Sequence, residues 1–309
     1  MTAHRTILVP LDGSTLSQQS LALVQTLMNK TTEVHLVQVV PQHRGYLPME
    51  IEMEYGWSKQ IEFIVARHAQ EELEAFAKRL GDSNALGMVP TVHVPIGDPA
   101  DTIIDMAREV KADLIVMTTH GHGAIKRVLF GSVADRVVRY SPVPVLVMRP
   151  GGPLEDDAPA SIQRIVVPLD GSPLAERALP VVTTMATQLG VPVLLVRAIH
   201  LDFVVPRVDG TFLIPQESID CIQRFAQDYL SAIRDHLVQE GIVVSIAAEW
   251  GTPFEIIDEL SANDDLIVMT SHGRGGVGRW LLGSVAEKLV RSAKAPVLLV
   301  PVRKANETR

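Results

Sequence analysis

The sequence predicts an α/β fold made of two tandem domains, each with a five-stranded parallel sheet flanked by helices. The first observation is a long internal repeat: residues 7–14 (ILVPLDGS) return as 165–172 (IVVPLDGS), and residues 114–121 (LIVMTTHG) return as 266–273 (LIVMTSHG). The second is that short β-branched runs alternate with helical patterns, which is typical of a parallel sheet covered on both faces. The third is that the repeated segments are mostly loops after strands, where open α/β sheets bind ligands.

The repeat divides the chain into two domain-sized units. Its period of about 150 residues is far above the 20–50 residues of solenoid repeats, and 309 residues suffice for two domains with a core each. Residues 150–159 (PGGPLEDDAP) combine proline, glycine and acidic residues and are typical of a linker. We therefore expect a first domain over residues 1–150, a linker over 151–161 and a second domain over 162–309.

The elements of each half follow from its hydrophobic pattern. In the first half, strands are predicted at residues 7–10, 33–40, 89–94, 114–118 and 143–148, and helices at 15–29, 58–80, 99–110 and 132–140. In the second half, strands are predicted at residues 165–168, 193–199, 243–248, 266–270 and 296–300. This alternation is Rossmann-like, so a ligand site is expected beyond the carboxyl ends of the strands, where strand order reverses.

Composition and charge exclude several classes of protein. A formal charge of −8 argues against nucleic acid or an anionic membrane as the main partner, because both favour excess Lys and Arg. No apolar run approaches the roughly 20 residues that span a bilayer, and no secretory signal is seen. The one cysteine, Cys221, excludes an internal disulfide and fits a reducing compartment; with Ile222, Phe225 and Tyr229 it predicts a packed thiol on a helix. We expect a soluble, cytoplasmic protein.

Residues 131–135 (GSVAD) and 283–287 (GSVAE) have two interpretations. Ser132 and Ser284, each followed three residues later by an acidic residue, form a capping-box pattern that needs no ligand. Alternatively, the glycine, the serine and the following Val133 or Val285 leave amides free at a helix N-terminus, where they bind phosphate. The preceding loop favours the second interpretation, because nine residues separate Gly121 from Gly131, and nine separate Gly273 from Gly283.

Asp12 and Asp170 also have two interpretations. Each follows the first strand of its half, where helix initiation would explain it, with Ser14 or Ser172 as the cap and Pro173 at a first helical position. Because those serines already supply a cap, we favour a ligand-binding role for the two aspartates. Asp98-Pro99 and Thr252-Pro253 follow the third strands, and there the cap with a first-turn proline is the favoured interpretation.

Over almost its whole length the chain resembles a tandem universal stress protein. That family carries Gly-x-x-Gly, nine residues, then Gly-Ser or Gly-Thr, which holds the ribose and phosphates of ATP in its nucleotide-binding members. The later positions match in both halves: Gly121, Gly131, Ser132, Gly273, Gly283 and Ser284. The leading glycine is replaced by Thr118 and Thr270. Their Cβ atoms narrow the approach to the phosphates, whereas their hydroxyls offer donors to the ligand, and the sequence leaves both effects open.

The resemblance also implies roles for other residues. Asp12 and Asp170 correspond to an aspartate that contacts the nucleoside, and Val39 and Ala198 lie where a backbone group contacts adenine. His120 and His272 are expected to shape the loop or to reach toward phosphate. A metal at His120 and His122 is not expected, because no other ligand completes the set and the second half has Arg274 instead.

Three functions follow from this interpretation. We expect a stress-response or regulatory protein that binds an adenine nucleotide and has no committed catalysis. Its ligand is expected to be ATP, ADP or AMP, with or without Mg²⁺. The first alternative is a slow ATPase, although no general base or Mg²⁺ carboxylate pair is evident and no Gly-x-x-x-x-Gly-Lys-Ser/Thr motif occurs. The second is an interaction module that has lost nucleotide binding. Whether one or both halves bind is left open by the sequence.

The resemblance further implies an internal pseudo-dimer, in which the two halves pair through the apolar edges of their last strands, at residues 144–147 and 296–299. The tandem chain is also expected to form a homodimer and to have unidentified protein partners. Proteolytic cleavage of the linker tests the internal pairing. The halves are expected to stay together on size-exclusion chromatography after cleavage, and monodisperse separate halves would contradict the prediction.

Overall fold

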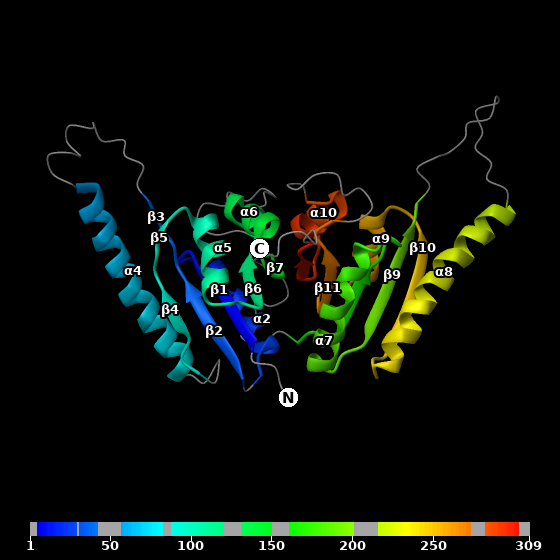
Figure 1. Ribbon diagram of the computed structural model, residues 1–309, viewed down its shortest axis with the longest axis horizontal. Helices are drawn as coiled ribbons and strands as arrows, with labels where there is room; N and C mark the ends of the chain where they lie inside the picture. Colours follow the sequence, from blue (N-terminus) through cyan, green and yellow to red (C-terminus); the bar gives the residue numbers. More distant parts are fainter. Residues whose placement is uncertain are drawn as a thin grey trace, which may run out of the picture. The chain divides into compact units, whose positions relative to one another are not determined.

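The computed structural model describes residues 5–29, 31–42, 57–82, 88–119, 131–149, 161–200, 216–272 and 282–302. The chain divides into two compact units, Met1–Ala160 and Ser161–Arg309, and Figure 1 traces the elements of each. In this described part, no helix combines the length and apolar character needed to cross a membrane.

The first unit contains a parallel sheet with strand order β7-β6-β1-β2-β4. Its strands are β1 (Arg5–Pro10), β2 (Thr32–Val37), β4 (Thr91–His93), β6 (Leu114–Thr118) and β7 (Val145–Met148), and a separate pair consists of β3 (Val40–Pro41) and β5 (Ile96–Gly97). The helices are α1 (Thr15–Gln18), α2 (Ser20–Leu27), α4 (Trp57–Asp82), α5 (Pro99–Glu109) and α6 (Ser132–Tyr140).

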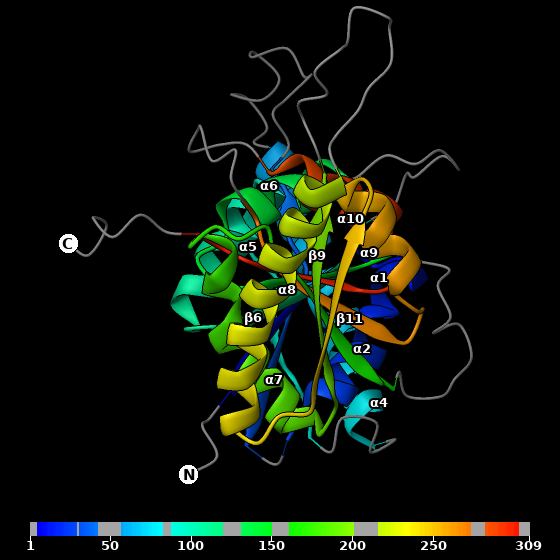
Figure 2. The ribbon, with the colours of Figure 1, turned by 90° about the vertical axis from the view of Figure 1, so that its right-hand side faces the viewer.

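The second unit repeats this order as β10-β9-β8-β11-β12, also with parallel pairing. Its strands are β8 (Arg164–Pro168), β9 (Val193–Ile199), β10 (Val244–Trp250), β11 (Asp265–Thr270) and β12 (Val297–Val300). The helical elements are η1 (Ala175–Ala178), α7 (Leu179–Leu189), α8 (Gln216–Gln239), α9 (Pro253–Leu260) and α10 (Ser284–Ser292). Figure 2 shows α7 and α8 on one side of this sheet and α9 and α10 on the other.

The predicted fold class is confirmed, and the strand cores explain why it could be recognised. Ile165, Val166 and Val167 of β8 are all fully buried, as are Ile7 and Leu8 of β1. A strand with both faces buried must be apolar at every position, because helices cover the sheet on either side. The unbroken apolar runs in the sequence are therefore the direct consequence of two-sided burial.

Two predicted elements of the first unit are each divided in the structure. The helix predicted at residues 15–29 is two helices, because the hydroxyls of Ser17 and Ser20 donate to the carbonyls of Ser14 (2.9 Å) and Ser17 (2.7 Å) and compete with the helical pattern. The strand predicted at residues 33–40 ends at Val37, and a short strand resumes at Val40. Val39 therefore lies between β2 and β3 rather than inside a strand.

The packing predicted for Cys221 is wrong, because its side chain is exposed on α8. The buried residues of this helix are Ala226, Leu230 and Leu237. At about 100° per residue, Cys221 lies on the opposite face from Leu230. Phe225, the predicted neighbour of the thiol, is itself 69% exposed.

Candidate functional site

The best-defined site lies at the carboxyl ends of β8, β9 and β11 in the second unit. The chain order runs outward from β8 to β9 and β10, and then returns to β11 on the other side of β8. Strand order therefore reverses between β8 and β11, which is the position where open α/β sheets bind ligands. Asp170 follows β8, and Thr270 ends β11.

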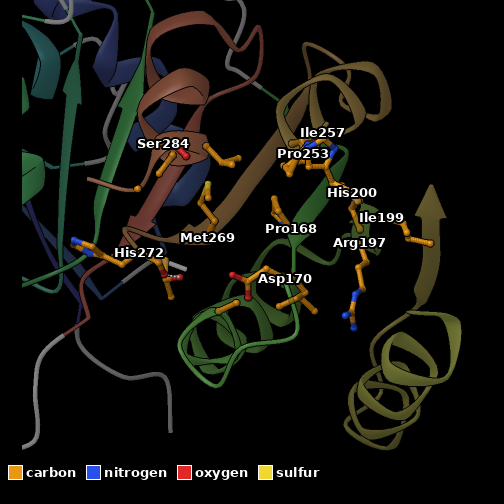
Figure 3. A pocket seen from close by; sticks show the side chains of 18 of the residues that line it. Pro168, Asp170, Arg197, Ile199, His200, Pro253, Ile257, Met269, His272 and Ser284 are labelled. Atoms are coloured by element: carbon orange, nitrogen blue, oxygen red, sulfur yellow. Dashed lines mark hydrogen bonds between the residues drawn. The ribbon is translucent and has the colours of Figure 1, made fainter. Parts of the chain in front are cut away.

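A cavity of about 720 Å³ opens at this position. It is lined by every predicted site residue of the second half that the structure describes, namely Asp170, Ala198, Thr270, His272, Gly283, Ser284 and Val285. Gly273 lies outside the described residues. Figure 3 shows Asp170 entering from one side and Ser284 from another, with Met269 between them. The structure thus brings together residues that are more than a hundred positions apart in the sequence.

Asp170 is held in a tight turn at the floor of the cavity. Its Oδ1 accepts a hydrogen bond from the Ser172 amide (2.9 Å), and the intervening Gly171 has a φ of +82°, in the region that favours glycine. Ser172 Oγ accepts from the amide of Ala175 (3.2 Å), the first residue of η1, but the N-cap position of η1 is held by Leu174 and not by the predicted Ser172. The predicted place of Pro173 is wrong: it lies in a turn, and the first-turn proline of α7 is Pro180.

The N-terminus of α10 faces the same cavity. Gly283 is its N-cap, and glycine has no side chain with which to cap the helix. The helix begins with Ser284, Val285 and Ala286, and all three line the cavity. Their amides have no intrahelical acceptor, because no helical carbonyl lies four residues before them. Three amides with the positive end of the helix dipole form an anion-binding arrangement.

The capping box predicted as the alternative is not formed. Ser284 is the first helical residue rather than the N-cap, and its acidic partner Glu287 pairs with Arg291 (2.8 Å) instead of reaching back. The first unit behaves in the same way: Ser132 follows the N-cap Gly131, and Asp135 pairs with Arg139 (2.8 Å). Because a glycine occupies each N-cap position, the N-cap residue supplies no side-chain acceptor to the first amides of the helix, which favours the anion-binding interpretation.

Thr270, Ser271 and His272 form local contacts where β11 ends. Thr270 Oγ1 donates to the carbonyl of His272 (2.7 Å), and the Thr270 side chain is almost fully buried. The hydroxyl proton is therefore committed to the backbone and not available for donation to a ligand. The His272 ring interacts through Nδ1 with Ser271 Oγ (3.0 Å) and is turned away from Asp170 in Figure 3.

The predicted site residues of the first unit that the structure describes occupy equivalent positions. Asp12 Oδ1 accepts from the amide (3.0 Å) and the hydroxyl (2.6 Å) of Ser14, and Ser14 caps α1 as predicted. The Gly131 amide donates to the carbonyl of Thr119 (3.0 Å), and a Cβ at Gly131 would meet that oxygen at 2.9 Å. Glycine is therefore required here for close packing against the strand end.

The remaining first-unit residues are placed as follows. Thr118 ends β6 and is buried, Ser132 is exposed, Val133 is half-buried, and Val39 follows β2. His120 and Gly121 lie outside the described residues. In the part of the chain that the structure describes, no three His, Cys, Asp or Glu side chains are grouped to hold a metal ion.

The third-strand loops include the predicted helix starts. Asp98 caps α5 by accepting from the amides of Ala100 (3.1 Å) and Asp101 (3.2 Å), as predicted. Thr252 holds the N-cap position of α9, but its hydroxyl donates to Glu255 (2.7 Å) rather than serving as a cap. Pro253, the next residue, lines the cavity.

Several lining residues were not predicted from the sequence as members of the site. They include Arg197, Ile222, Phe225, Ile257 and Met269. The apolar members carry no signal that separates them from ordinary core residues. Arg197 does carry one, because it is a charged residue inside the otherwise apolar strand Val193–Ile199.

Comparisons with known proteins agree with this arrangement. The sequence model of the Universal stress protein family matches residues 3–149 and again residues 161–301. Universal stress protein Rv2005c of Mycobacterium tuberculosis is 30% identical over 206 residues, which is 65% of this chain and 65% of that protein. Universal stress protein Rv1996 of the same organism is 27% identical over 323 residues, covering 98% of each chain.

A solved structure supports the fold. The crystal structure of a universal stress protein from Archaeoglobus fulgidus superimposes with a TM-score of 0.67 and 22% identity, and it covers 96% of this chain and 98% of that one. At this identity the likeness concerns the fold alone. The two matches of the family model cover nearly the whole sequence, and this chain therefore belongs to the universal stress protein family, with two tandem domains.

Proposed function

We propose that this protein binds an adenine nucleotide, ATP, ADP or AMP, as a regulatory ligand in a stress response, without committed catalysis. The observation that carries the proposal is the uncapped N-terminus of α10, which opens into a cavity at the strand-order reversal. A nucleotide has an anionic end, sugar hydroxyls and a flat, largely apolar base. The cavity has a complementary group for each of these parts: helix amides for the anionic end, the Asp170 carboxylate for the sugar hydroxyls and an apolar wall for the base.

Each chemical group of a nucleotide has suitable residues in the cavity. The amides of Ser284, Val285 and Ala286 suit phosphate oxygens, and a carboxylate such as that of Asp170 accepts from hydroxyls. Pro253, Ile257 and Met269 supply apolar surface for a base. The cavity volume of about 720 Å³ lies within the usual range for small-molecule sites. The choice of adenine rests on the nucleotide-binding members of the family.

As a regulator, the nucleotide would act by binding one conformation of the chain, or one assembly, more tightly than another. The tandem chain is proposed to form a homodimer and to present a nucleotide-dependent surface to protein partners. Neither step requires bond cleavage in the ligand. A turnover above roughly 1 s⁻¹, typical of enzymes, that fell on changing Asp12 or Ser132 would instead establish an ATPase.

This function is tested by denaturing freshly purified protein and identifying the released small molecules by mass spectrometry. Stoichiometric ATP, ADP or AMP is expected, or, for protein isolated empty, thermal stabilisation by ATP with Mg²⁺. A ligand at about 100 times its Kd adds roughly 2.7 kcal/mol to the free energy of unfolding. No released nucleotide together with no thermal shift would contradict the proposal and favour an interaction module.

A further inference from the structure

The two units differ in the side chains that surround the aspartate turn. In the second unit, Arg197 of β9 lies against Gly171, where its guanidinium nitrogens are 3.1 Å from the position that a Cβ would occupy. The same guanidinium lies 4.8 Å from the centroid of the Tyr229 ring on α8. Figure 3 shows the Arg197 side chain leaving β9 in the direction of α8, on the side of the cavity that holds Asp170.

A set of contacts, called the circuit below, runs from the turn at Gly171 through Arg197, Tyr229 and Glu176 back to the element after the turn. Tyr229 Oη donates to Glu176 Oε1 (3.0 Å), and Glu176 lies on η1, the element that directly follows the turn. Burial, and then the hydrogen bond to Glu176, raise the pKa of Tyr229, so its hydroxyl stays protonated and remains the donor. The turn at Gly171 is thus held by β9, by α8 through Tyr229, and by η1 through Glu176.

The first unit lacks this circuit. The strand register aligns Val37 with Val196, because each pairs with the proline that ends the first strand of its unit, and so Gln38 stands where the second unit has Arg197. Its Nε2 is 3.5 Å from the Cβ position of Gly13. The buried pair Ala69 and Leu73 matches Ala226 and Leu230.

The alignment of these two helices places Glu72 where the second unit has Tyr229. The shared Asp-Gly-Ser turn, in which Asp12, Gly13 and Ser14 match Asp170, Gly171 and Ser172, places Gln18 where the second unit has Glu176. The first unit therefore has no cation, no aromatic ring and no phenol–carboxylate hydrogen bond at these three positions. Asp12 is exposed, whereas Asp170 is half-buried.

Building on the proposed function, we infer that Arg197, together with Tyr229 and Glu176, is a positioning device that makes the second unit the tighter nucleotide site. The physical reason is preorganisation: a turn already fixed in its binding geometry loses less conformational freedom when the ligand arrives. A guanidinium stacked on an aromatic ring adds an attraction of its own, which glutamine cannot make. Arg197 also lines the cavity, and its proposed role is to fix the turn from which Asp170 meets the ligand.

Two variants of the full chain, each with only one intact nucleotide site, allow the Kd of each site to be measured separately. Ser132→Glu puts a negative charge at the first helix start and leaves only the second site, and Ser284→Glu leaves only the first. Calorimetric titration with ATP and Mg²⁺ is expected to give at least a roughly tenfold lower Kd for the second site, or about 1.4 kcal/mol. Adding Arg197→Gln to the Ser132→Glu background should remove most of that advantage.

A gain of affinity separates positioning from a merely structural role. Gln38→Arg with Glu72→Tyr, in the Ser284→Glu background, copies two members of the circuit into the first unit and is expected to lower its Kd severalfold. Arg177→Gln, which removes an exposed arginine from η1, is the matched control and should leave the second site unchanged. Thermal unfolding of every variant without ATP verifies that it remains folded.

The outcomes separate the inference from the proposed function. Equal Kd values in the two single-site backgrounds, or a second site indifferent to Arg197→Gln, would overturn the inference while leaving nucleotide binding intact. If the unmodified chain binds no ATP, both the proposed function and the inference fail.

Discussion

Replacing Ser284 with glutamate is expected to weaken nucleotide binding at the second site by roughly a hundredfold or more. The introduced carboxylate would stand at the first residue of α10, among the amides that are proposed to receive phosphate. Two like charges about 4 Å apart at a protein surface repel by up to about 4 kcal/mol. Ser284 itself is exposed, and no hydrogen bond of its hydroxyl is found among the described residues.

The same substitution is expected to leave the fold intact or to stabilise it. A negative charge in the first turn of a helix is favourable by about 0.3–1 kcal/mol. Binding and stability should therefore change in opposite directions, which general unfolding cannot imitate. Calorimetric titration with ATP and urea unfolding of the same sample give the two values, and Ser284→Thr, which adds no charge, is the control. Retained affinity in Ser284→Glu would place the phosphates elsewhere.

Replacing Asp265 with alanine is expected to lower the free energy of unfolding of the second unit by about 3–5 kcal/mol. Asp265 begins β11 and is 2% exposed. Its carboxylate receives two hydrogen bonds from Arg164 of β8 (2.6 and 3.1 Å) and one from the Ala262 amide (2.8 Å). Removing it leaves the half-buried Arg164 guanidinium with the Leu260 carbonyl (2.9 Å) but without its carboxylate partner, and the Ala262 amide loses its acceptor.

Asp264 provides the control for this prediction, because it is the adjacent acidic residue and is exposed. Asp264→Ala is expected to change stability by less than about 0.5 kcal/mol. Urea unfolding, followed by a probe that reports on the second unit, measures both variants. A loss below about 1 kcal/mol for Asp265→Ala would mean that water or relaxation satisfies Arg164 in its absence.

Much of the fold follows from the sequence for a simple physical reason. Strands buried on both faces are mainly apolar, so β6 and β9 have the bounds that the sequence predicts, although β6 ends at Thr118 and β9 contains Arg197. The helix α6 also begins and ends at the predicted residues. Competition between serine hydroxyls and backbone amides for the same carbonyl oxygens is harder to predict. The break between α1 and α2 depends on which carbonyl each serine hydroxyl selects, and this choice depends on rotamers that the sequence does not display.

The candidate site was predictable to the extent that it repeats. Asp170, Thr270 and Ser284 lie in segments that recur at the same places in the first half, and this recurrence marks those segments as candidates for a site. The circuit of Arg197, Tyr229 and Glu176 does not recur, and it joins a strand, a helix and a turn that only tertiary packing brings together. What distinguishes the two units therefore lies in tertiary contacts rather than in the shared motifs.

Hydrogen–deuterium exchange of the full chain, with and without saturating ATP and Mg²⁺, tests the central claim most directly. The amides of Ser284, Val285 and Ala286 lack intrahelical acceptors, so they are expected to exchange rapidly in the free protein and to become protected by the nucleotide. Ser284→Glu should abolish that protection under the same conditions. Protection at the start of α10 would establish this helix terminus as the phosphate site. Unchanged exchange there, at an ATP concentration that saturates the protein, would contradict the account.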